Sequence, residues 1–237
     1  MIVVKSLEEL SKNPFTSPFA LVPTMGNLHE GHINLLEIAR EKNFLPVVSI
    51  FVNPLQFGPN EDLDKYPRTL DNDLEILEKN NCHGVFIPQE NEILKNIEPL
   101  EAPFADKLCA KSRPGHFNGV ITIVNKLFEV TNPQACVFGM KDFQQQLIIQ
   151  HLIKTKQYEI QFLSAPVVRD TNGLALSSRN NYLTSKQRTE ASKVFTFLSE
   201  IQEEIKLSFK KQKKTLPIDL DTIKDNYVQI IENKGFK

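Results

Sequence analysis

The sequence contains few cysteines and no long apolar run. Its three cysteines, Cys82, Cys109 and Cys136, are widely separated, and no CxxC pair or Cys/His cluster occurs. This argues against a structural zinc site and suits a reducing compartment. No apolar run approaches the roughly 20 residues of a membrane span, and the N-terminus lacks the basic and apolar segments of a signal peptide. We therefore expect a cytoplasmic protein without a membrane partner.

The charge balance and the composition are those of an ordinary globular protein. The 237 residues include 28 basic and 29 acidic side chains, a net charge of −1. Such a balance gives no electrostatic reason to expect nucleic acid as a partner. The length allows one large domain or two modest ones, and 41% hydrophobic residues suffice for a real core.

The usual signatures of nucleotide loops and of covalent catalysis are also missing. No Walker A pattern, no GxGxxG and no GxSxG occurs in the sequence. A nucleotide site would therefore have to be built from other donors, and no loop presents an evident covalent nucleophile.

Apolar, β-branched runs alternate with longer amphipathic stretches. Strands are predicted at residues 19–23, 45–53, 82–88, 134–139 and 158–168, and helices at 32–43, 69–81, 118–132 and 141–156. This alternation predicts an α/β fold, a Rossmann-like doubly wound parallel sheet, over residues 1–167. Residues 168–237 change character. They contain a polar loop and two helical stretches around Pro217, which predicts a smaller C-terminal domain.

Two histidines follow the first predicted strand, in "PTMGNLHEGH". His29 and His32 are three residues apart at a predicted helix start, so they share a face near free backbone N–H groups. Gly26 and Gly31 would let a ligand approach the backbone closely. This arrangement suits phosphate. Taken alone, however, the spacing is more typical of solvent-facing or buried structural histidines, and a metal pair would lack a nearby third ligand.

Other loops should meet the histidines at the same sheet edge, because ligands of such folds lie beyond the carboxyl ends of the strands. "GMKD" offers Lys141 as a point charge for phosphate, and "LSSR" offers two hydroxyls and the guanidinium of Arg179. The carboxamides of Asn53, Gln56 and Gln145 lie beside apolar residues, which suits a small hydroxylated, partly aliphatic molecule. Each of these features alone could be structural.

Six blocks in order carry a resemblance to a known family. They are "PTMGNLHEGH", "SIFVNPLQF", "YPRTLDND", "SRPGHFNGVITIVNKLF", "FGMKDFQQ" and "GLALSSRNNYLT". Together they closely resemble the pantothenate synthetase (pantoate–β-alanine ligase) family, over most of residues 19–184. "HEGH" is similar to the HIGH motif of the nucleotidylyltransferase superfamily, and "LSSR" stands where that superfamily has its KMSKS loop.

The resemblance implies an AMP-forming ligase of pantothenate and coenzyme A biosynthesis. ATP would be a substrate, accompanied by Mg²⁺. Pantoate would first form pantoyl adenylate and release pyrophosphate, and β-alanine would then displace AMP. The family also implies a homodimer. Two alternatives stay open: another small-molecule nucleotidylyltransferase, or a catalytically weakened nucleotide-binding module.

The family's site residues transfer onto matching positions of this sequence. The catalytic set is His32, His29, Lys141 and Arg179, with His32 as the family's proton donor. The ATP site would comprise Met25, Gly26, Asn27, Leu28, His29, Glu30, Gly31, His32, Gly139, Met140, Lys141, Asp142, Val168, Leu176, Ser177, Ser178 and Arg179. The pantoate and β-alanine site would comprise Met25, Asn53, Gln56 and Gln145.

Four further residues have less definite expectations. Arg113 and His116 are expected near the phosphates or in an adjacent loop. Asp71 and Asp73 are either metal ligands or the acidic start of a helix, and the metal ligands stay unassigned.

The sequence departs from the family pattern at two places. Met140 stands where the family usually has glutamate, so this position is expected to act mainly through its backbone. The sequence also stops at "NKGFK", where the family continues into a small C-terminal sheet with covering helices. The C-terminal domain is therefore expected to be incomplete.

Overall fold

The structure, a computed structural model, describes residues 1–15, 17–211 and 220–233. The chain divides into two compact units, Met1–Val168 and Arg169–Lys237. Each is described by itself. The helix break predicted at Pro217 lies outside the described residues.

The first unit is built on a six-stranded sheet whose strands are all parallel. The strands are β1 (Ile2–Val4), β2 (Phe19–Thr24), β3 (Leu45–Ile50), β4 (Gly84–Phe86), β5 (Ala135–Gly139) and β6 (Gln161–Ala165), in the order β1-β4-β3-β2-β5-β6. β2 and β3 pair in register from Phe19 with Leu45 to Thr24 with Ile50. Their carboxyl ends are therefore level, which places the loops that follow them side by side.

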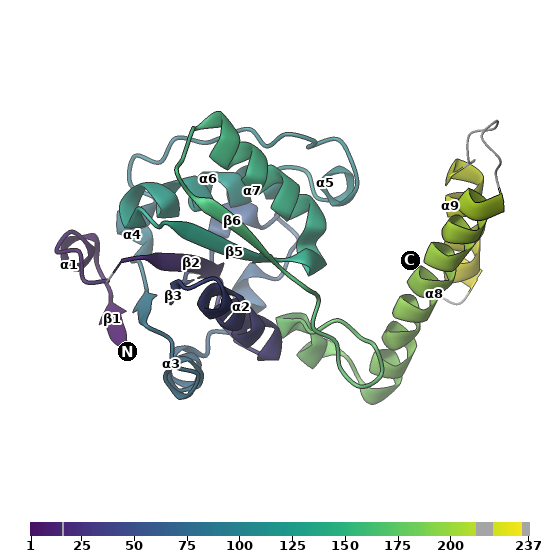
Figure 1. The fold of residues 1–237 in the computed structure, drawn as a ribbon, viewed down its shortest axis with the longest axis horizontal. Helices are drawn as coiled ribbons and strands as arrows, with labels where there is room; N and C mark the ends of the chain where they lie inside the picture. Colours follow the sequence, from purple (N-terminus) through teal and green to yellow (C-terminus); the bar gives the residue numbers. More distant parts are fainter. Residues whose placement is uncertain (16, 212–219, 234–237) are drawn as a thin grey trace. The chain divides into compact units, whose positions relative to one another are not determined.

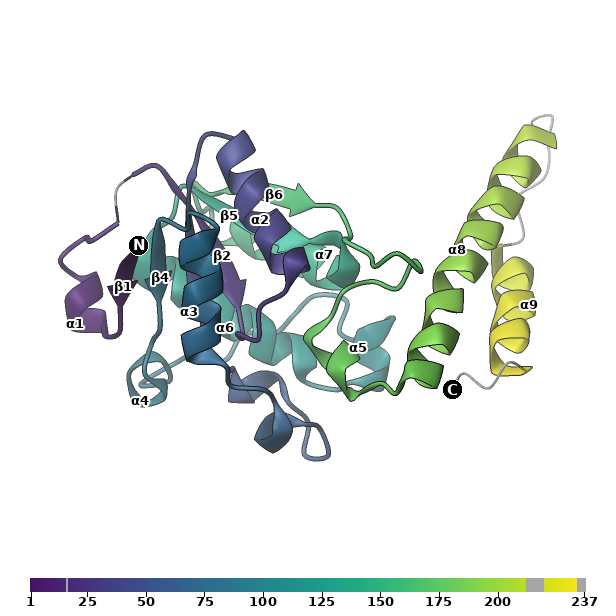
Figure 2. The same cartoon turned by 90° about the horizontal axis from the view of Figure 1, so that it is seen from below.

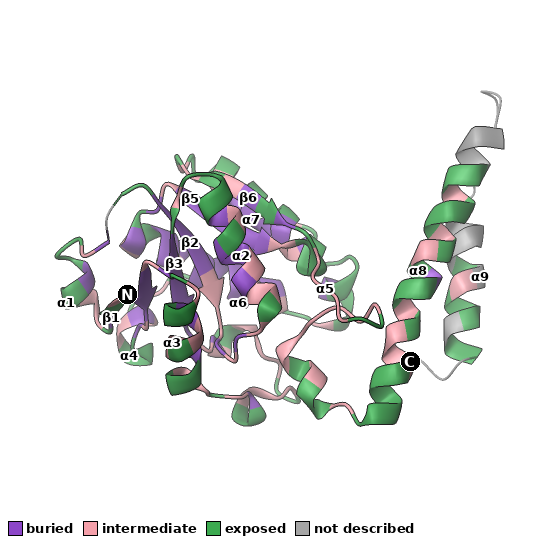
Figure 3. Ribbon diagram, turned by 60° about the horizontal axis from the view of Figure 1, so that its bottom comes forward, coloured by how far each residue is buried: buried purple, intermediate pink, exposed green. Residues whose placement is uncertain are grey.

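Both faces of this sheet are buried, which explains its nearly continuous apolar strands (Figure 3). Successive strand residues point to opposite faces. Leu21 and Val47 accordingly join one hydrophobic core, and their neighbours Val22 and Val48 join the other. All four side chains are fully buried. A shift of one residue in the pairing would move each of these side chains to the opposite face of the sheet.

Helices cover the sheet on both sides (Figure 1). α2 (Glu30–Glu41) and α3 (Leu70–Lys79) pack on one face. α6 (His116–Thr131) and α7 (Phe143–Thr155) pack on the other, where the short helices α1 (Leu7–Leu10), α4 (Glu90–Ile93) and α5 (Cys109–Ser112) also contribute residues. Figure 2 shows α2 and α3 in front of the strands and α6 behind them. The predicted doubly wound α/β fold is confirmed.

Several of these elements had no signal in the sequence pattern. The edge strand β1 has three residues, and α1, α4 and α5 have four residues each. Such short elements span little more than one hydrophobic period, so periodicity does not reveal them.

The second unit contains a turn and two helices. Asp170 closes the turn by accepting hydrogen bonds from the N–H groups of Asn172 and Leu174, at 2.9 and 3.0 Å. The guanidinium of Arg169 lies 3.9 Å from the centre of the Phe195 ring on α8 (Ser185–Lys211), and α9 (Leu220–Asn233) follows. Across the described residues, no helix is long and apolar enough to cross a membrane.

Candidate active site

The predicted site residues of the first unit lie where the winding of the sheet reverses. From β2 the chain moves through β3 to β4 on one side, and it then returns to place β5 on the other side of β2. The crevice beyond the carboxyl ends of β2 and β5 is thus the topological switch point, the usual ligand position of such sheets. His29 and His32 enter it from β2, and Lys141 enters it from β5. The three side chains are close enough for the Lys141 charge to lower the pKa of both histidines.

The two histidines cap the first turn of α2. His29 is the N-cap residue, and its Nδ1 accepts a hydrogen bond from the N–H of Gly31 at 3.1 Å. The Nδ1 of His32 accepts in return from the backbone N–H of His29 at 3.2 Å. This reciprocal pattern is a capping box made by imidazoles instead of the usual hydroxyl and carboxylate. It satisfies two N–H groups that a helix start otherwise leaves unpaired.

The capping geometry fixes the tautomer of both rings. A nitrogen that accepts a hydrogen bond carries no proton, so each neutral imidazole holds its proton on Nε2. Burial and the Lys141 ammonium lower the pKa of His29 below its usual range. Burial, the adjacent His29 ring and Lys141 together lower the pKa of His32 to about 3. At neutral pH the site therefore presents two neutral Nε2–H donors beside one ammonium group.

A buried carboxylate holds the loop that carries the histidines. Asp73 of α3 is 1% exposed, and it accepts hydrogen bonds from the N–H groups of Asn27 and Leu28, at 2.9 and 2.8 Å, and from the Thr69 hydroxyl at 3.1 Å. Gly26 has φ +79°, and a Cβ there would lie 2.9 Å from Asp73 Oδ2. Gly26 is therefore required both by its backbone conformation and by this contact.

Asp73 therefore has a structural role, because it fixes the backbone of the histidine loop. The sequence alone had left it open whether Asp73 is a metal ligand or part of an acidic helix start. Its oxygens already serve three donors, while Asp71 is exposed. Across the described residues, no group of three or more histidine, cysteine, aspartate or glutamate side chains is placed to hold a metal ion.

The remaining predicted residues of the histidine loop line the turn into α2. Met25 and Asn27 are partly buried, Leu28 is buried, and Glu30 is exposed as the first residue of the helix.

The loop after β5 presents Lys141 next to open space. Gly139 has an ordinary φ of −79°, and a Cβ there would meet only Leu35 Cδ2, at 4.0 Å. Met140 is 45% exposed. Lys141 Nζ lies 3.5 Å from the Asp142 carboxylate, a partly exposed pair of the kind that contributes little to stability. Lys141 can therefore turn towards an anion at low energetic cost.

The side chain of Asn53 is buried and forms its hydrogen bonds within the protein. It is 2% exposed, and its Oδ1 accepts from the N–H of Leu55 at 3.0 Å. Its Nδ2 donates to Gln56 Oε1 and to the Gly119 carbonyl, both at 3.0 Å. These bonds leave no amide hydrogen of Asn53 for a substrate. They also orient the partly buried Gln56 so that its Nε2 donor remains available.

Gly119 allows α6 to approach the loop that carries Gln56. A Cβ at Gly119 would lie 2.1 Å from the carbonyl oxygen of Leu55 and 2.6 Å from the backbone nitrogen of Gln56. No side chain fits there, so the glycine sets the distance between α6 and the short 3₁₀ helix Pro54–Gln56. Its sequence position, inside a predicted helix, gave no hint of this role.

Arg113 and His116 contact the loop of Gln56 and the residues that follow it. Arg113 pairs with Glu61 through two hydrogen bonds, one of them from Nε at 2.6 Å. Its Nη1 lies 2.9 Å from His116 Nε2, and His116 Nδ1 lies 2.8 Å from the Gln56 carbonyl. Because arginine only donates, His116 must accept at Nε2 and donate from Nδ1 to the carbonyl. The pair therefore lies beside the Gln56 loop, and burial lowers the pKa of His116.

Three consecutive glutamines at the start of α7 have different roles. Gln144 is buried, and its Nε2 donates to the carbonyls of Phe104 and Lys107. Gln146 is also buried, donates to the Phe138 carbonyl and accepts from Ser164. The partly buried Gln145 amide has no hydrogen-bond partner among the described residues. Gln145 is therefore the one of the three whose amide is unbonded among the described residues, and its binding of a ligand stays a prediction.

The predicted ATP residues beyond β6 divide between the two units. Val168 closes the first unit, and Leu176, Ser177, Ser178 and Arg179 belong to the second. Ser177 caps the 3₁₀ helix Ser178–Tyr182 by accepting from the Arg179 N–H at 3.3 Å. The Arg179 residue is exposed. The loop is thus a short capped turn that presents a guanidinium.

Comparison with known proteins assigns this architecture to one family. The family model described as pantoate-beta-alanine ligase matches residues 3–237. The chain belongs to this family. The pantothenate synthetase of Thermosipho melanesiensis is 38% identical over 100% of this chain and 89% of its own length. The pantothenate synthetase of Idiomarina loihiensis is 45% identical over 88% and 76%.

Solved structures agree with the family assignment. The pantothenate synthetase of Thermus thermophilus matches with a TM-score of 0.83 and 37% identity, covering 88% of this chain and 77% of that one. A pantoate-beta-alanine ligase from Francisella tularensis, solved in complex with beta-gamma ATP and beta-alanine, matches with a TM-score of 0.81 and 33% identity over 99% and 86%.

Proposed function

We propose that this chain joins pantoate to β-alanine in two steps, through pantoyl adenylate, at the switch point between β2 and β5. The ATP-dependent condensation in pantothenate biosynthesis is the reaction of the family to which the chain belongs. The observation that carries the proposed site is the meeting of two neutral Nε2–H donors and the Lys141 ammonium at that crevice.

In the first step a pantoate carboxylate oxygen attacks the α-phosphorus of ATP. A phosphorus–oxygen bond forms, the bond to the β-phosphate breaks, and pyrophosphate leaves. His29 and His32 donate hydrogen bonds to phosphate oxygens whose charge increases in the transition state, and Lys141 supplies a positive charge. The substrates provide both reacting groups, so the protein acts by positioning them and stabilising charge.

The second step forms the amide bond. The ammonium group of β-alanine first gives a proton to solvent. The resulting amine attacks the acyl carbon of the adenylate, the acyl carbon–oxygen bond breaks, AMP leaves, and the nitrogen loses its second proton to solvent. Gln56 Nε2 and the Gln145 amide are the donors that hold pantoate in place through both steps, while Asn53 positions Gln56. Met25 borders both substrates.

The loop after β5 and the segment after β6 carry the other residues that we assign to nucleotide binding. We assign Gly139, Met140, Lys141 and Asp142 to the edge of the nucleotide site, Met140 acting through its backbone. The family resemblance also assigns Val168, Leu176, Ser177, Ser178 and Arg179 to ATP binding. Mg²⁺ enters with the triphosphate, because this ion retains several waters and is usually held by substrate phosphates and few carboxylates.

Assembly and compartment are proposals of the same kind. A homodimer follows from the family resemblance, and light scattering of the purified protein tests it. A reducing, cytoplasmic location suits three cysteines that form no disulfide in the described structure.

The decisive assay follows isotope exchange between pyrophosphate and ATP. We expect exchange that requires pantoate and proceeds without β-alanine, and AMP release that requires all three substrates. Exchange that requires β-alanine, or that occurs without pantoate, would exclude the adenylate route.

A further inference from the structure

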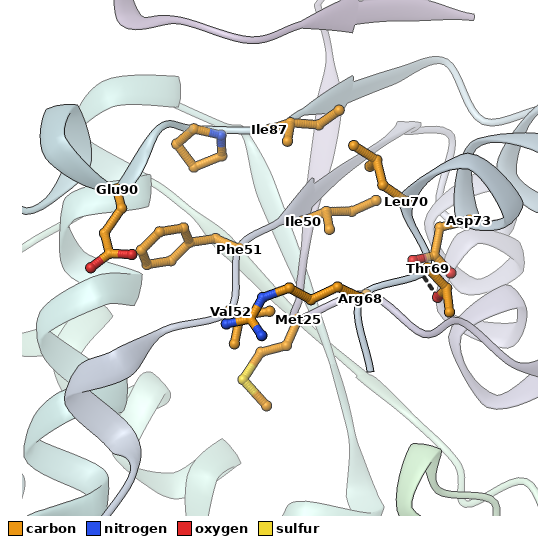
Figure 4. A pocket seen from close by; sticks show the side chains of 12 residues that line it. Met25, Ile50, Phe51, Val52, Arg68, Thr69, Leu70, Asp73, Ile87 and Glu90 are labelled. Atoms are coloured by element: carbon orange, nitrogen blue, oxygen red, sulfur yellow. Dashed lines mark hydrogen bonds between the residues drawn. The ribbon is translucent and has the colours of Figure 1, made fainter. Parts of the chain in front are cut away.

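A second concave site lies at the carboxyl edge of β3 and β4, beside the histidine loop. Its cavity measures about 330 Å³, at the small end of ligand pockets. Figure 4 shows the apolar side chains of Ile50 and Phe51 between Ile87 on one side and Arg68 on the other. Met25 also lines this cavity. Since Met25 borders the proposed pantoate site, the two sites are neighbours.

Two opposite charges line this otherwise apolar cavity. Arg68 precedes α3, and Glu90 begins α4. Within the described residues neither side chain has a hydrogen-bond or ion-pair partner. The third charged lining residue, Asp73, is already occupied by three donors.

This combination fits a small zwitterion. A guanidinium binds a carboxylate through parallel N–H donors, a carboxylate binds an ammonium group, and the apolar side chains accommodate a short methylene chain. We propose that this cavity binds the amine substrate, β-alanine, with its carboxylate on Arg68 and its ammonium group on Glu90. The assignment rests on the proposed function. Pantoate has no cation, so it would leave Glu90 unused.

Neutral variants of the two residues test this assignment. Arg68→Gln and Glu90→Gln should each raise the KM for β-alanine by roughly tenfold, the loss of one charge-assisted hydrogen bond. The KM for pantoate and the pantoate-dependent pyrophosphate exchange should not change. Glu98→Gln, an exposed glutamate outside the cavity, serves as the control. Unchanged thermal unfolding verifies that each variant folds.

Substrate analogues separate the two charges. The unmodified protein should prefer β-alanine to propylamine, which lacks the carboxylate, and Arg68→Gln should reduce that preference. Propionate lacks the amine, so its inhibition constant should be the same in Glu90→Gln as in the unmodified protein. A KM for β-alanine that moves no more than in Glu98→Gln would overturn the inference, as would an effect confined to pantoate. Loss of pyrophosphate exchange in the unmodified protein would instead refute the proposed function.

Discussion

The imidazoles of His29 and His32 lie 4.1 Å apart between ring centres, and each accepts a backbone N–H bond at the start of α2. The same contact that begins the helix directs both Nε2–H donors away from it. The same two rings therefore cap the helix through Nδ1 and supply the proposed phosphate donors through Nε2. A useful substitution removes one of these two functions and keeps the other.

Two conservative changes at His32 make that separation. The Oδ1 of asparagine can replace the capping Nδ1 but supplies no donor at the Nε2 position, whereas glutamine can place its Nε2 close to that position. We expect His32→Asn to lower the rate of pyrophosphate exchange by about 10²- to 10³-fold, the usual cost of one lost transition-state donor. Thermal unfolding should change little.

His32→Gln should recover part of the rate lost in His32→Asn. Equal loss in the two variants, or full exchange activity in His32→Asn, would remove the proposed role of the Nε2 donor.

The low histidine pKa values predict how stability depends on pH. The native state keeps His32 neutral down to a pKa of about 3, while the unfolded chain protonates its histidines below about pH 6.5. The unfolded state thus binds more protons between these values, so the free energy of unfolding should fall as pH decreases from about 6.5. His29 and His116 act in the same direction.

Urea unfolding at a series of pH values from about 4.5 to 8 measures this effect. His32→Asn should reduce the pH dependence by up to about one proton, and stability should be nearly constant between about pH 7 and 8. An unchanged slope in the variant would show that His32 titrates normally in the native protein.

The three glutamines of α7 should separate binding from stability. Gln145→Ala should raise the KM for pantoate by roughly tenfold and leave thermal unfolding unchanged, because its amide bonds to no described residue. Gln146→Ala should lower the free energy of unfolding by about 1–3 kcal/mol, because it removes the buried partner of the Phe138 carbonyl. The reverse pattern would exchange their assigned roles.

Two glycines offer a matched test of close packing. Gly119→Ala should destabilise the protein by about 1–3 kcal/mol and raise the KM for pantoate, because the new Cβ would displace the loop at Leu55 and Gln56. Gly139→Ala introduces the same methyl group into open space at an ordinary φ, so unfolding should not change.

At Gly139 any effect should fall on the KM for ATP. Equal stability of the two variants in chemical denaturation would contradict the packing argument.

The sequence predicted the long elements and the edge at which the loops meet, for a clear physical reason. Strands β2 and β3 are buried on both faces, so their apolar runs are continuous, and α2 and α6 span enough turns to show a period. β1, α1, α4 and α5 are too short for either signal, and each contributes residues to a core that forms only in the folded chain.

The sequence predicted which candidate residues lie at one sheet edge, but not the contacts that each of them makes. The predicted topology placed His29, His32 and Lys141 at one edge. The sequence interpretation also chose Gln145, but it could not show that Gln144 and Gln146 are buried and bonded inside the protein. Nor could it show that Asn53 uses its amide hydrogens on Gln56 and Gly119. Those distinctions arise from contacts between residues far apart in the chain, such as Asn53 with Gly119, 66 positions away.

The central claim is that a pantoate oxygen bonds to the α-phosphorus of ATP at the crevice between β2 and β5. Pantoate labelled with ¹⁸O in its carboxylate, incubated with ATP and β-alanine, tests this directly by mass spectrometry of the products. We predict that AMP carries one labelled oxygen and that pyrophosphate carries none. Unlabelled AMP would contradict the adenylate route.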